Sequence, residues 1–368
     1  MGLLGHPASV DGRYRHAVER FSRAGFCRLT ALFGPQHGFL GQTQDNMVEW
    51  DGYRDAGSGL PVFSLYGKTR KPTAEMLDVI DVLAVDLQDV GARYYTFIWT
   101  LDLCMEALAR AGKSMVVLDR PNPIGGSAVE GPVLEKGWES FVGRRCLPVR
   151  HGMTVGEIAT YLKETFHLDL ELVVIRMQGW NRTEDFESTG LPWFMPSPNM
   201  PTVDTAFVYP GLCLLEGTNL SEGRGTTRPF EIFGAPFIEP ARLVARLREF
   251  KLPGVLFRPL SFEPTFQKHA GRLCGGAQIH VLDRKRFRPV LTGAAILRTA
   301  LELYPRQFRW KRPPYEYERK KLPIDILAGT DRLRQDLEGG RSLSEMGAAW
   351  KDDAAAFMKR TAYRFLLY

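Results

Sequence analysis

A polar segment between residues 214 and 231, LLEGTNLSEGRGTTRPFE, holds the densest group of chemically capable side chains in the sequence. It offers two carboxylates, an amide and a guanidinium: Glu216, Glu222, Asn219 and Arg224. The segment has neither helical nor strand periodicity, so it cannot present a regular apolar face to a core. One interpretation is a solvated linker. Its apolar flanks, residues 209–215 and 229–236, favour a loop that is held between packed elements and closes around a polar ligand.

Glu216 and Glu222 are spaced so that they could act as a pair of acids. Six residues of extended chain span up to about 20 Å, whereas the two carboxyl groups of a glycoside hydrolase lie about 5–9.5 Å apart. A reversal of the chain at Gly217 and Gly223 would close that gap. Each glutamate taken singly could equally be a structural anchor. We predict Glu216 and Glu222 as the first choices for catalysis.

Two residues outside this segment are further candidates for acid–base chemistry. Glu130 stands between apolar, glycine and proline residues, and burial there would raise its pKa, as a general acid requires. Its alternative role is to cap a nearby turn. His37 follows a predicted strand, where it could contact a substrate or serve as a structural hydrogen-bonding residue. Glu130 is therefore the third catalytic choice, and His37 joins the predicted site.

The signatures of several other mechanisms are missing. The chain has no GxGxxG, GxxxxGK[ST], HExxH or GxSxG motif, which disfavours a nucleotide-dependent enzyme, a zinc protease and a serine hydrolase. Its five cysteines are scattered without a CxxC pair, so neither a disulfide framework nor a structural zinc site is expected. The net charge of +6 comes without a basic block, so nucleic acid is not an expected partner. The remaining carboxylates, amides, histidines and arginines are typical of carbohydrate chemistry, in which a pair of acids cleaves the bond.

Short apolar runs alternate with amphipathic stretches over the first 180 residues, which predicts a Rossmann-like, doubly wound parallel sheet. The predicted strands are 29–33, 61–65, 80–86, 115–119 and 172–177, and the predicted helices are 11–24, 73–79, 94–111 (with Gly112 as its C-cap) and 154–166. Polar loops follow three of the strands, at residues 34–38, 86–93 and 119–123. Ligands of such folds bind beyond the carboxyl ends of the strands, so we expect these loops to converge on one site.

Nine polar residues on these and later loops are predicted to bind substrate. They are Gln36, Gln88, Asp89, Arg93, Asn122, His151, Asn199, Asn219 and Arg224. The two arginines are the predicted partners of a substrate carboxylate, because a guanidinium matches a carboxylate with two parallel hydrogen bonds. Asp89 and Arg93 could also form a capping and salt-bridge network for the helix that follows.

Regular elements resume after an irregular stretch, rich in proline and glycine, at residues 180–235. A helix is predicted at 240–250, a strand at 277–282 and a helix at 293–303. We therefore expect a Rossmann-like catalytic domain at 1–230 and a smaller α+β domain at 231–368.

The chain as written is expected to be cytoplasmic. No apolar run approaches the ~18 residues of a membrane span, and no signal peptide precedes the first predicted helix. The sequence begins with MGLLGHPA, as though within a strand. The alternative is therefore an upstream leader that directs the protein to another compartment. The oligomeric state also stays open.

Seven motifs in order closely resemble the exo-β-N-acetylmuramidase family NamZ, formerly a domain of unknown function. They are GPQHGF, GLPVFSLYG with KPT, DLQDVGARYYTF, LDRPNPIGG with VEGPVL, RHGMT, GLPWFMPSPNMPT and EGTNLSEGRGTTRPFE, and the likeness continues through PGVLFRP, GAQIHVLD and RFLLY. The resemblance implies a Rossmann-like N-terminal domain, a smaller C-terminal α/β domain, a substrate in the cleft between them, and neither metal nor nucleotide. It implies release of N-acetylmuramic acid from the non-reducing end of peptidoglycan fragments, which gives Arg93 or Arg224 a lactyl carboxylate to bind.

The tetrapeptide at residues 35–38 departs from the family pattern. It reads Pro-Gln-His-Gly, whereas many family members carry Pro-Glu-His-Gly, and the amide of Gln36 cannot exchange a proton as a carboxyl group does. Residues 42–47, QTQDNM, also differ from the acidic, glycine-containing segment of relatives. We expect Gln36, His37 and Asn219 to bind ring hydroxyls or the acetamido group, and the acid–base pair to lie among Glu130, Glu216 and Glu222. The alternatives are a related substrate, or a non-catalytic muropeptide-binding protein that has lost hydrolysis.

Overall fold

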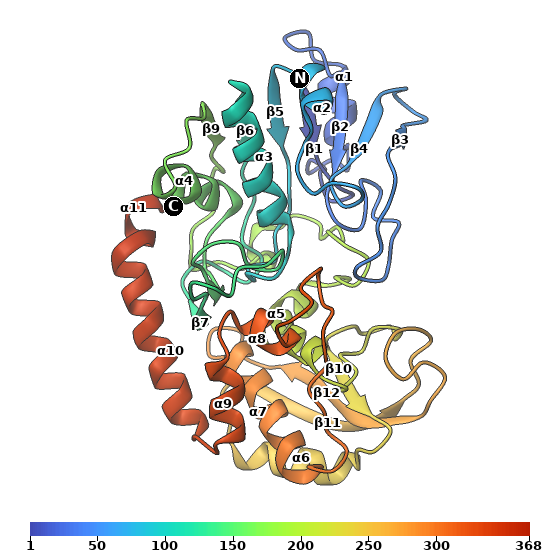
Figure 1. Cartoon of the computed structure of the whole chain (residues 1–368), viewed down its shortest axis with the longest axis vertical. Helices are drawn as coiled ribbons and strands as arrows, with labels where there is room; N and C mark the ends of the chain where they lie inside the picture. The colour runs from blue at the N-terminus through green and yellow to red at the C-terminus, as the bar shows by residue number, and fades with distance from the viewer.

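Two lobes make up the protein, one above the other in Figure 1. The structure is a computed structural model that describes the backbone of all 368 residues and the side chains of all except residues 361–363. The upper lobe, called the first lobe below, is built on a mostly parallel sheet, and the lower, second lobe is built on a small antiparallel sheet.

The sheet of the first lobe has seven strands in the order β3-β4-β2-β1-β5-β6-β9. These are β1 (Gly2–Leu4), β2 (Ala31–Gly34), β3 (Tyr53–Arg54), β4 (Pro61–Ser64), β5 (Val82–Val85), β6 (Ser114–Leu118) and β9 (Leu172–Ile175). All neighbours pair in parallel except β3 and β4. Without β3, the strands lie in the order third, second, first, fourth, fifth, sixth, which is the doubly wound order. The predicted fold class and the five predicted strands are confirmed.

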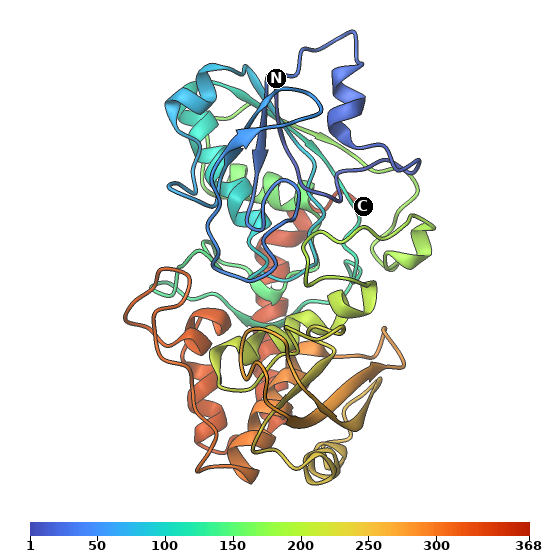
Figure 2. The ribbon, with the colours of Figure 1, turned by 90° about the vertical axis from the view of Figure 1, so that its right-hand side faces the viewer.

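Four helices pack on this sheet: α1 (Ala17–Ser22), α2 (Ala74–Asp78), α3 (Phe97–Ala111) and α4 (Val155–Thr165). Figure 2 shows α1 on one side of the sheet and α2 and α3 on the other, and α4 packs beside α3. Gly112 ends α3 with a φ of 63°, as predicted, because glycine adopts the left-handed conformation without a Cβ clash. The first helix is shorter than predicted. The Asp11 carboxylate accepts the backbone N–H groups of Arg13 and Arg15 and holds the chain in a turn there.

The second lobe contains the three-stranded antiparallel sheet β10-β12-β11 and most of the remaining helices. Its elements are α5 (Val203–Leu212), η2 (Cys213–Gly217), β10 (Ile232–Ala235), α6 (Pro240–Glu249), β11 (Val255–Phe262), β12 (Cys274–Val281), α7 (Pro289–Leu303), α8 (Pro323–Ala328) and α9 (Arg332–Glu338). The predicted helices at 240–250 and 293–303 and the predicted strand at 277–282 are all present. A short antiparallel pair, β7 (Glu130–Val133) with β8 (Pro148–Arg150), and the 3-10 turn η1 (Glu187–Thr189) complete the first lobe.

Residues 203–230, which the sequence placed with the first domain, lie in the second lobe. Helix α5 packs against α7, and η2 packs against α8. Every residue of α5 except Asp204 is buried, so the helix has no polar face that would mark it in the sequence as a separate element. The seam between the lobes therefore passes just before α5.

The C-terminus returns to the first lobe. Helix α10 (Leu343–Phe357), followed by η3 (Met358–Ala362) and α11 (Tyr363–Phe365), runs along both lobes to a position beside α4 (Figure 1). There the backbone N–H of Leu367 donates to Glu157 and the Tyr368 hydroxyl donates to Asp119, each at 2.8 Å. The predicted second domain thus ends in a segment that packs on the first.

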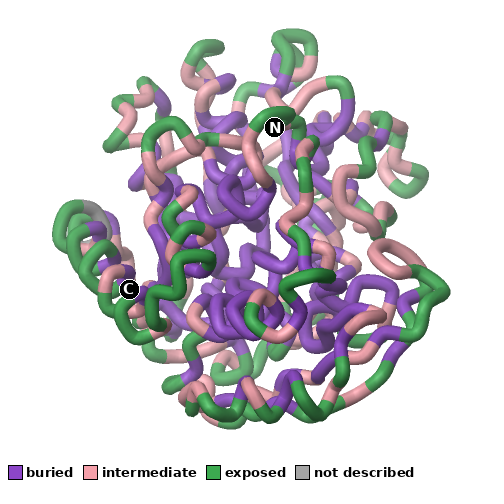
Figure 3. The backbone as a smooth tube through the Cα atoms, turned by 60° about the horizontal axis from the view of Figure 1, so that its bottom comes forward, coloured by how far each residue is buried: buried purple, intermediate pink, exposed green. Residues whose placement is uncertain are grey.

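One hydrophobic cluster extends through both lobes and across the seam. It includes Trp99 of the first lobe and Leu215 and Leu327 of the second, and buried backbone is concentrated in the middle of the molecule in Figure 3. Polar groups at the seam are consequently shielded from water. Among the described residues, no helix combines the length and apolarity needed to cross a bilayer.

Candidate active site

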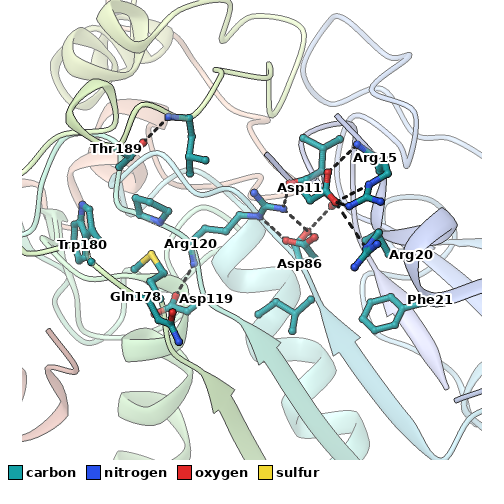
Figure 4. Close-up of a pocket in the computed structure, with 18 of the residues that line it drawn as sticks. Asp11, Arg15, Arg20, Phe21, Asp86, Asp119, Arg120, Gln178, Trp180 and Thr189 are labelled. Atoms are coloured by element: carbon teal, nitrogen blue, oxygen red, sulfur yellow. Dashed lines mark hydrogen bonds and ion pairs between the residues drawn. The ribbon is translucent and has the colours of Figure 1, made fainter. Parts of the chain in front are cut away.

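A wide hollow of about 900 Å³ opens at the carboxyl ends of β1, β5 and β6 (Figure 4). Doubly wound folds usually bind ligands at such a place. Here, however, Arg120 donates to both oxygens of Asp86, and Arg15 donates to Asp11. The opposite charges are already paired, and none of the thirteen predicted site residues lines this hollow.

A second, narrower cavity of about 40 Å³ lies at the seam, and we call it the interlobe cavity. The first lobe lines it with polar side chains from the loop after β2, the start of α3 and the loop before α5: Gln36, His37, Asn46, Thr96, Ser197 and Asn199. The second lobe adds two carboxyl groups, a guanidinium and two phenols: Glu216, Glu316, Arg224, Tyr209 and Tyr315. Five predicted site residues therefore meet here, namely Gln36, His37, Asn199, Glu216 and Arg224.

Glu216 is the predicted carboxylate that reaches this cavity. It lies on η2 with only 4% of its surface exposed. One carboxylate oxygen accepts from Nη2 of Arg224 at 2.8 Å, and the other accepts from Nδ2 of Asn46 at 2.9 Å and the hydroxyl of Tyr315 at 2.8 Å. A buried carboxylate surrounded by one cation and two neutral donors is held in a fixed orientation.

Arg224 connects Glu216 to Glu222. The Nε of Arg224 lies 3.6 Å from Glu222, which also accepts from Nζ of Lys268 at 2.9 Å. Burial alone would lower the pKa of Arg224, but the two carboxylates outweigh it and raise that pKa. Nη1 of Arg224 is buried and has no hydrogen-bond partner among the residues whose side chains are described. An unpaired guanidinium nitrogen inside a cavity can bind an anionic group of a ligand.

Glu222 does not line the interlobe cavity. The chain reverses at Gly223, whose φ is 83°, and this reversal brings Glu222 to the same guanidinium as Glu216. Burial by itself would raise the pKa of Glu222, but Lys268 and Arg224 outweigh burial and lower it. Glu222 is thus an ionised anchor for Arg224.

His37 and Gln36 line the wall of the first lobe. His37 has a φ of 72°, and its Nδ1 lies 2.7 Å from the carbonyl oxygen of Thr43. Burial lowers the pKa of His37 to about 4, so the ring is neutral near pH 7. Because a carbonyl only accepts, Nδ1 carries the proton and Nε2 is a hydrogen-bond acceptor. Gln36 accepts from the Thr96 hydroxyl at 2.6 Å, and Asn199 donates to the Gln44 carbonyl at 2.6 Å.

Glu130 lies outside the cavity. Its carboxylate accepts the backbone N–H of Leu291 at 2.8 Å, in the first turn of α7. Burial raises the pKa of Glu130 to about 7. The sequence left open whether this residue is a general acid or a cap, and the structure places it at a helix N-terminus, where a carboxylate caps free N–H groups.

Six more predicted substrate-binding residues also lie outside the cavity and bind the protein backbone or one another: Gln88, Asp89, Arg93, Asn122, His151 and Asn219. Arg93 shows why. It is fully buried and donates to the carbonyls of Pro132, Leu147 and Leu327, which joins the first lobe to α8. A polar side chain on a loop has the same appearance in a sequence whether its partner is a ligand or a carbonyl group.

Glu316 is the cavity carboxyl group that the sequence did not single out. It is 4% exposed, and it accepts from the Tyr66 hydroxyl at 2.9 Å and from Nε2 of Gln36 at 3.3 Å. Burial raises its pKa to about 7. The available signal was the stretch PPYEYE at 313–318, in which carboxylates alternate with aromatic residues close to two prolines. Asn46 and Tyr315, the neutral donors to Glu216, were missed as well.

Comparison with known proteins places these features in a family. The model of the N-terminal domain of the exo-beta-N-acetylmuramidase NamZ matches residues 1–204, and the model of its C-terminal domain matches residues 207–368. The peptidoglycan beta-N-acetylmuramidase NamZ of Bacillus subtilis is 45% identical over 368 residues, which are 100% of this chain and 86% of that protein.

Two crystal structures of DUF1343 family proteins from Bacteroides fragilis have the same fold. One superposes with a TM-score of 0.88 at 35% identity, and the other with a TM-score of 0.77 at 29% identity. Each comparison covers 100% of this chain and 93% of the solved chain. The family matches, the full-length relative and the shared fold agree, and the chain belongs to the exo-β-N-acetylmuramidase NamZ family.

Proposed function

We propose that this chain is an exo-β-N-acetylmuramidase that releases N-acetylmuramic acid from the non-reducing end of peptidoglycan fragments, and that the reaction takes place in the interlobe cavity. The family and the name of the Bacillus subtilis relative support the activity. One observation carries the choice of site: the buried carboxylate of Glu216 lies beside a guanidinium with a free nitrogen. The cytoplasmic location stays a prediction.

Glu216 acts on the anomeric carbon of the substrate. The transition state of glycoside hydrolysis resembles an oxocarbenium ion, so a carboxylate near the anomeric carbon stabilises the developing positive charge. Asn46 and Tyr315 hold that carboxylate in place through hydrogen bonds. Preorganised charge of this kind is among the largest contributions that an enzyme makes to the rate.

Arg224 binds the lactyl carboxylate that distinguishes N-acetylmuramic acid from N-acetylglucosamine. Its Nη1 is free, while Nη2 is engaged by Glu216 and Nε faces Glu222. A third carboxylate on the free nitrogen completes the charge pairing of the buried cation. Nε2 of His37, an acceptor in the neutral ring, and the amide of Asn199 bind hydroxyl or acetamido groups of the sugar.

The interlobe cavity must widen before a sugar can enter. A volume of about 40 Å³ has room for a few water molecules at most, since about 10–15 Å³ of such volume is needed to hold one. The described conformation is therefore a closed one. Closure excludes water and strengthens the electrostatic interactions inside the site.

The experiment compares Glu216→Gln with Glu222→Gln on an aryl β-N-acetylmuramide and on the disaccharide of N-acetylmuramic acid and N-acetylglucosamine. Glu216→Gln is expected to lower kcat by roughly 10²–10³-fold on both substrates. Glu222→Gln keeps an acceptor for Lys268 outside the cavity and should lower kcat much less. Turnover of Glu216→Gln at the wild-type rate would refute the assignment of Glu216. Saturable binding of muropeptides by the wild-type protein without any turnover would support the non-catalytic alternative, which the family membership disfavours.

A further inference from the structure

Glu316 enters the interlobe cavity from the second lobe and meets Gln36 of the first. Nε2 of Gln36 donates to one carboxylate oxygen at 3.3 Å, and the Tyr66 hydroxyl donates to the other at 2.9 Å. The carboxyl group of Glu316 is thus oriented by two neutral donors. No cation within hydrogen-bonding distance of it is found among the described side chains, in contrast to Glu216 and Glu222.

The backbone that carries Glu316 is held in an uncommon conformation. Glu316 and Tyr317 have φ values of 43° and 70°, in the left-handed region that residues with a Cβ rarely adopt. Backbone N–H and carbonyl groups of Tyr315 and Glu318 pair with each other across these two residues at 2.9 Å. Strain of this kind persists where surrounding contacts hold it and is concentrated at functional sites. Here it directs the Glu316 side chain inward, while Tyr317 points outward, 53% exposed.

We propose that Glu316 is the catalytic acid that protonates the glycosidic oxygen of the departing sugar, a role that rests on the proposed function of this cavity. Glu216 accepts a hydrogen bond from the cation Arg224 and Glu222 accepts one from the cation Lys268, whereas the hydrogen-bond donors to Glu316 are neutral. Gln36 has no proton to give, but its amide orients Glu316. The two carboxyl groups of the cavity then have different roles: Glu216 is the paired carboxylate and Glu316 is the acid.

The step balances as follows. The O–H bond of the Glu316 carboxyl group breaks, and its proton forms a bond to the glycosidic oxygen. The bond between the anomeric carbon and that oxygen breaks, and its electron pair leaves with the departing alcohol. The Glu316 carboxylate that results keeps its hydrogen bonds from Tyr66 and Gln36. The oxygen of a water molecule bonds to the anomeric carbon, and one water proton restores the starting protonation state.

The surroundings of Glu316 favour titration of its carboxyl group near neutral pH. Burial is the largest influence and raises its pKa to about 7, Tyr66 and Gln36 oppose burial through their hydrogen bonds, Glu216 raises the pKa further, and the more distant Arg70 lowers it. A general acid is most effective when its pKa lies near the working pH. Two carboxyl groups with different environments are the usual arrangement of acid and partner in a glycosidase.

The test compares the loss of kcat/KM on two substrates whose leaving groups differ in their need for a proton. Glu316→Gln should lower kcat/KM by about 10²–10⁴-fold on the disaccharide, whose alcohol leaves only when protonated. On the 4-nitrophenyl β-N-acetylmuramide the loss should be at least tenfold smaller, because nitrophenolate departs without a proton. Glu318→Gln, a change in the same loop at a residue outside the cavity, is the matched control and should behave as wild type on both substrates.

Two results would overturn the proposal while the proposed function stands: equal losses on both substrates, or wild-type rates on both. If the wild-type protein hydrolyses neither substrate, the proposed function itself is refuted. If the Glu316→Gln protein fails to fold, a second variant tests the same proposal. Tyr66→Phe removes a donor to the Glu316 carboxylate, which should raise the acid's pKa and move the alkaline limb of kcat/KM upward by about one pH unit. An unchanged alkaline limb would also overturn the assignment.

Discussion

Glu216 and Glu222, six residues apart in the chain, form ion pairs with different nitrogens of the single Arg224 guanidinium. Glu216 accepts from Nη2 at 2.8 Å, and Glu222 lies 3.6 Å from Nε. Glu216 therefore pairs with Nη2 and Glu222 lies beside Nε. The third nitrogen of the guanidinium group, Nη1, faces neither carboxylate and can bind a ligand. This relationship makes Arg224 the residue on which recognition of the lactyl group should depend.

Arg224→Lys tests this directly. An ammonium group is a compact charge that cannot bind Glu216, Glu222 and a substrate carboxylate with fork geometry. The ratio of kcat/KM for an aryl β-N-acetylmuramide to that for the corresponding β-N-acetylglucosaminide should fall by roughly 10–100-fold, the equivalent of one hydrogen bond to a charged group. Arg228→Lys, a change at a nearby arginine whose side chain is 48% exposed, is the control. An unchanged ratio in Arg224→Lys would contradict the assignment.

Glu130 should make the stability of the protein depend on pH. Its folded pKa of about 7 lies above the usual value of 4.5, so the folded state favours the protonated carboxyl group. The contribution of Glu130 to the stability of the folded state is therefore fully present below about pH 4.5, and it is lost as the pH rises through 7. Glu130→Gln removes this dependence. Between pH 4.5 and 8, the free energy of unfolding of the variant should gain up to about 3 kcal/mol relative to the wild type.

Urea denaturation at several pH values measures this difference, with Glu135→Gln as the control, because it removes a half-buried carboxylate after the same strand that pairs with the exposed Arg332. A difference between Glu130→Gln and wild type that is constant with pH would contradict the prediction. Because Glu130 does not line the interlobe cavity, the variant should also hydrolyse muramides at close to the wild-type rate.

The fold of the first lobe could be predicted because its local signals are strong. Strands buried on both faces, such as β2, appear as continuous apolar runs, and glycine and threonine mark helix ends, as at Gly112 and Thr154. Helix α5 could not be separated in the same way, because it is buried on all sides and therefore lacks an amphipathic pattern. Its place in the second lobe depends on tertiary packing alone.

The candidate site was harder to predict than the fold. Loop position and side-chain type together selected Gln36, His37 and Arg224, which line the interlobe cavity, but they equally selected Arg93, whose partners are carbonyl groups. Glu316 was missed because it is 280 residues from its partner Gln36, and no local pattern links them. Long-range pairing of this kind becomes visible only when the two lobes are brought together.

Arg93 should be essential to the folded structure and should not determine substrate preference. Arg93→Lys cannot reach the carbonyls of Pro132, Leu147 and Leu327 at once, so at least one buried acceptor loses its donor. We expect the free energy of unfolding to fall by about 2–4 kcal/mol. Arg110→Lys, at the exposed end of α3, should have little effect. Where Arg93→Lys remains folded, its preference for muramides over glucosaminides should match the wild type; a lost preference would identify Arg93 as the lactyl-binding arginine.

Opening of the interlobe cavity should be necessary for turnover, and one contact offers a way to prevent it. Gln267 of the second lobe donates to Asp45 and, at 2.8 Å, to Asn46, which in turn donates to Glu216. Asp45→Cys combined with Gln267→Cys, linked by a short bifunctional maleimide, would tie the loop after β2 to the second lobe. Because a cavity of about 40 Å³ cannot admit a sugar, the linked protein should lose at least 90% of its hydrolytic activity, while each single variant treated in the same way keeps it. Full activity in the linked protein would show that substrate enters by another route, with this loop closed throughout.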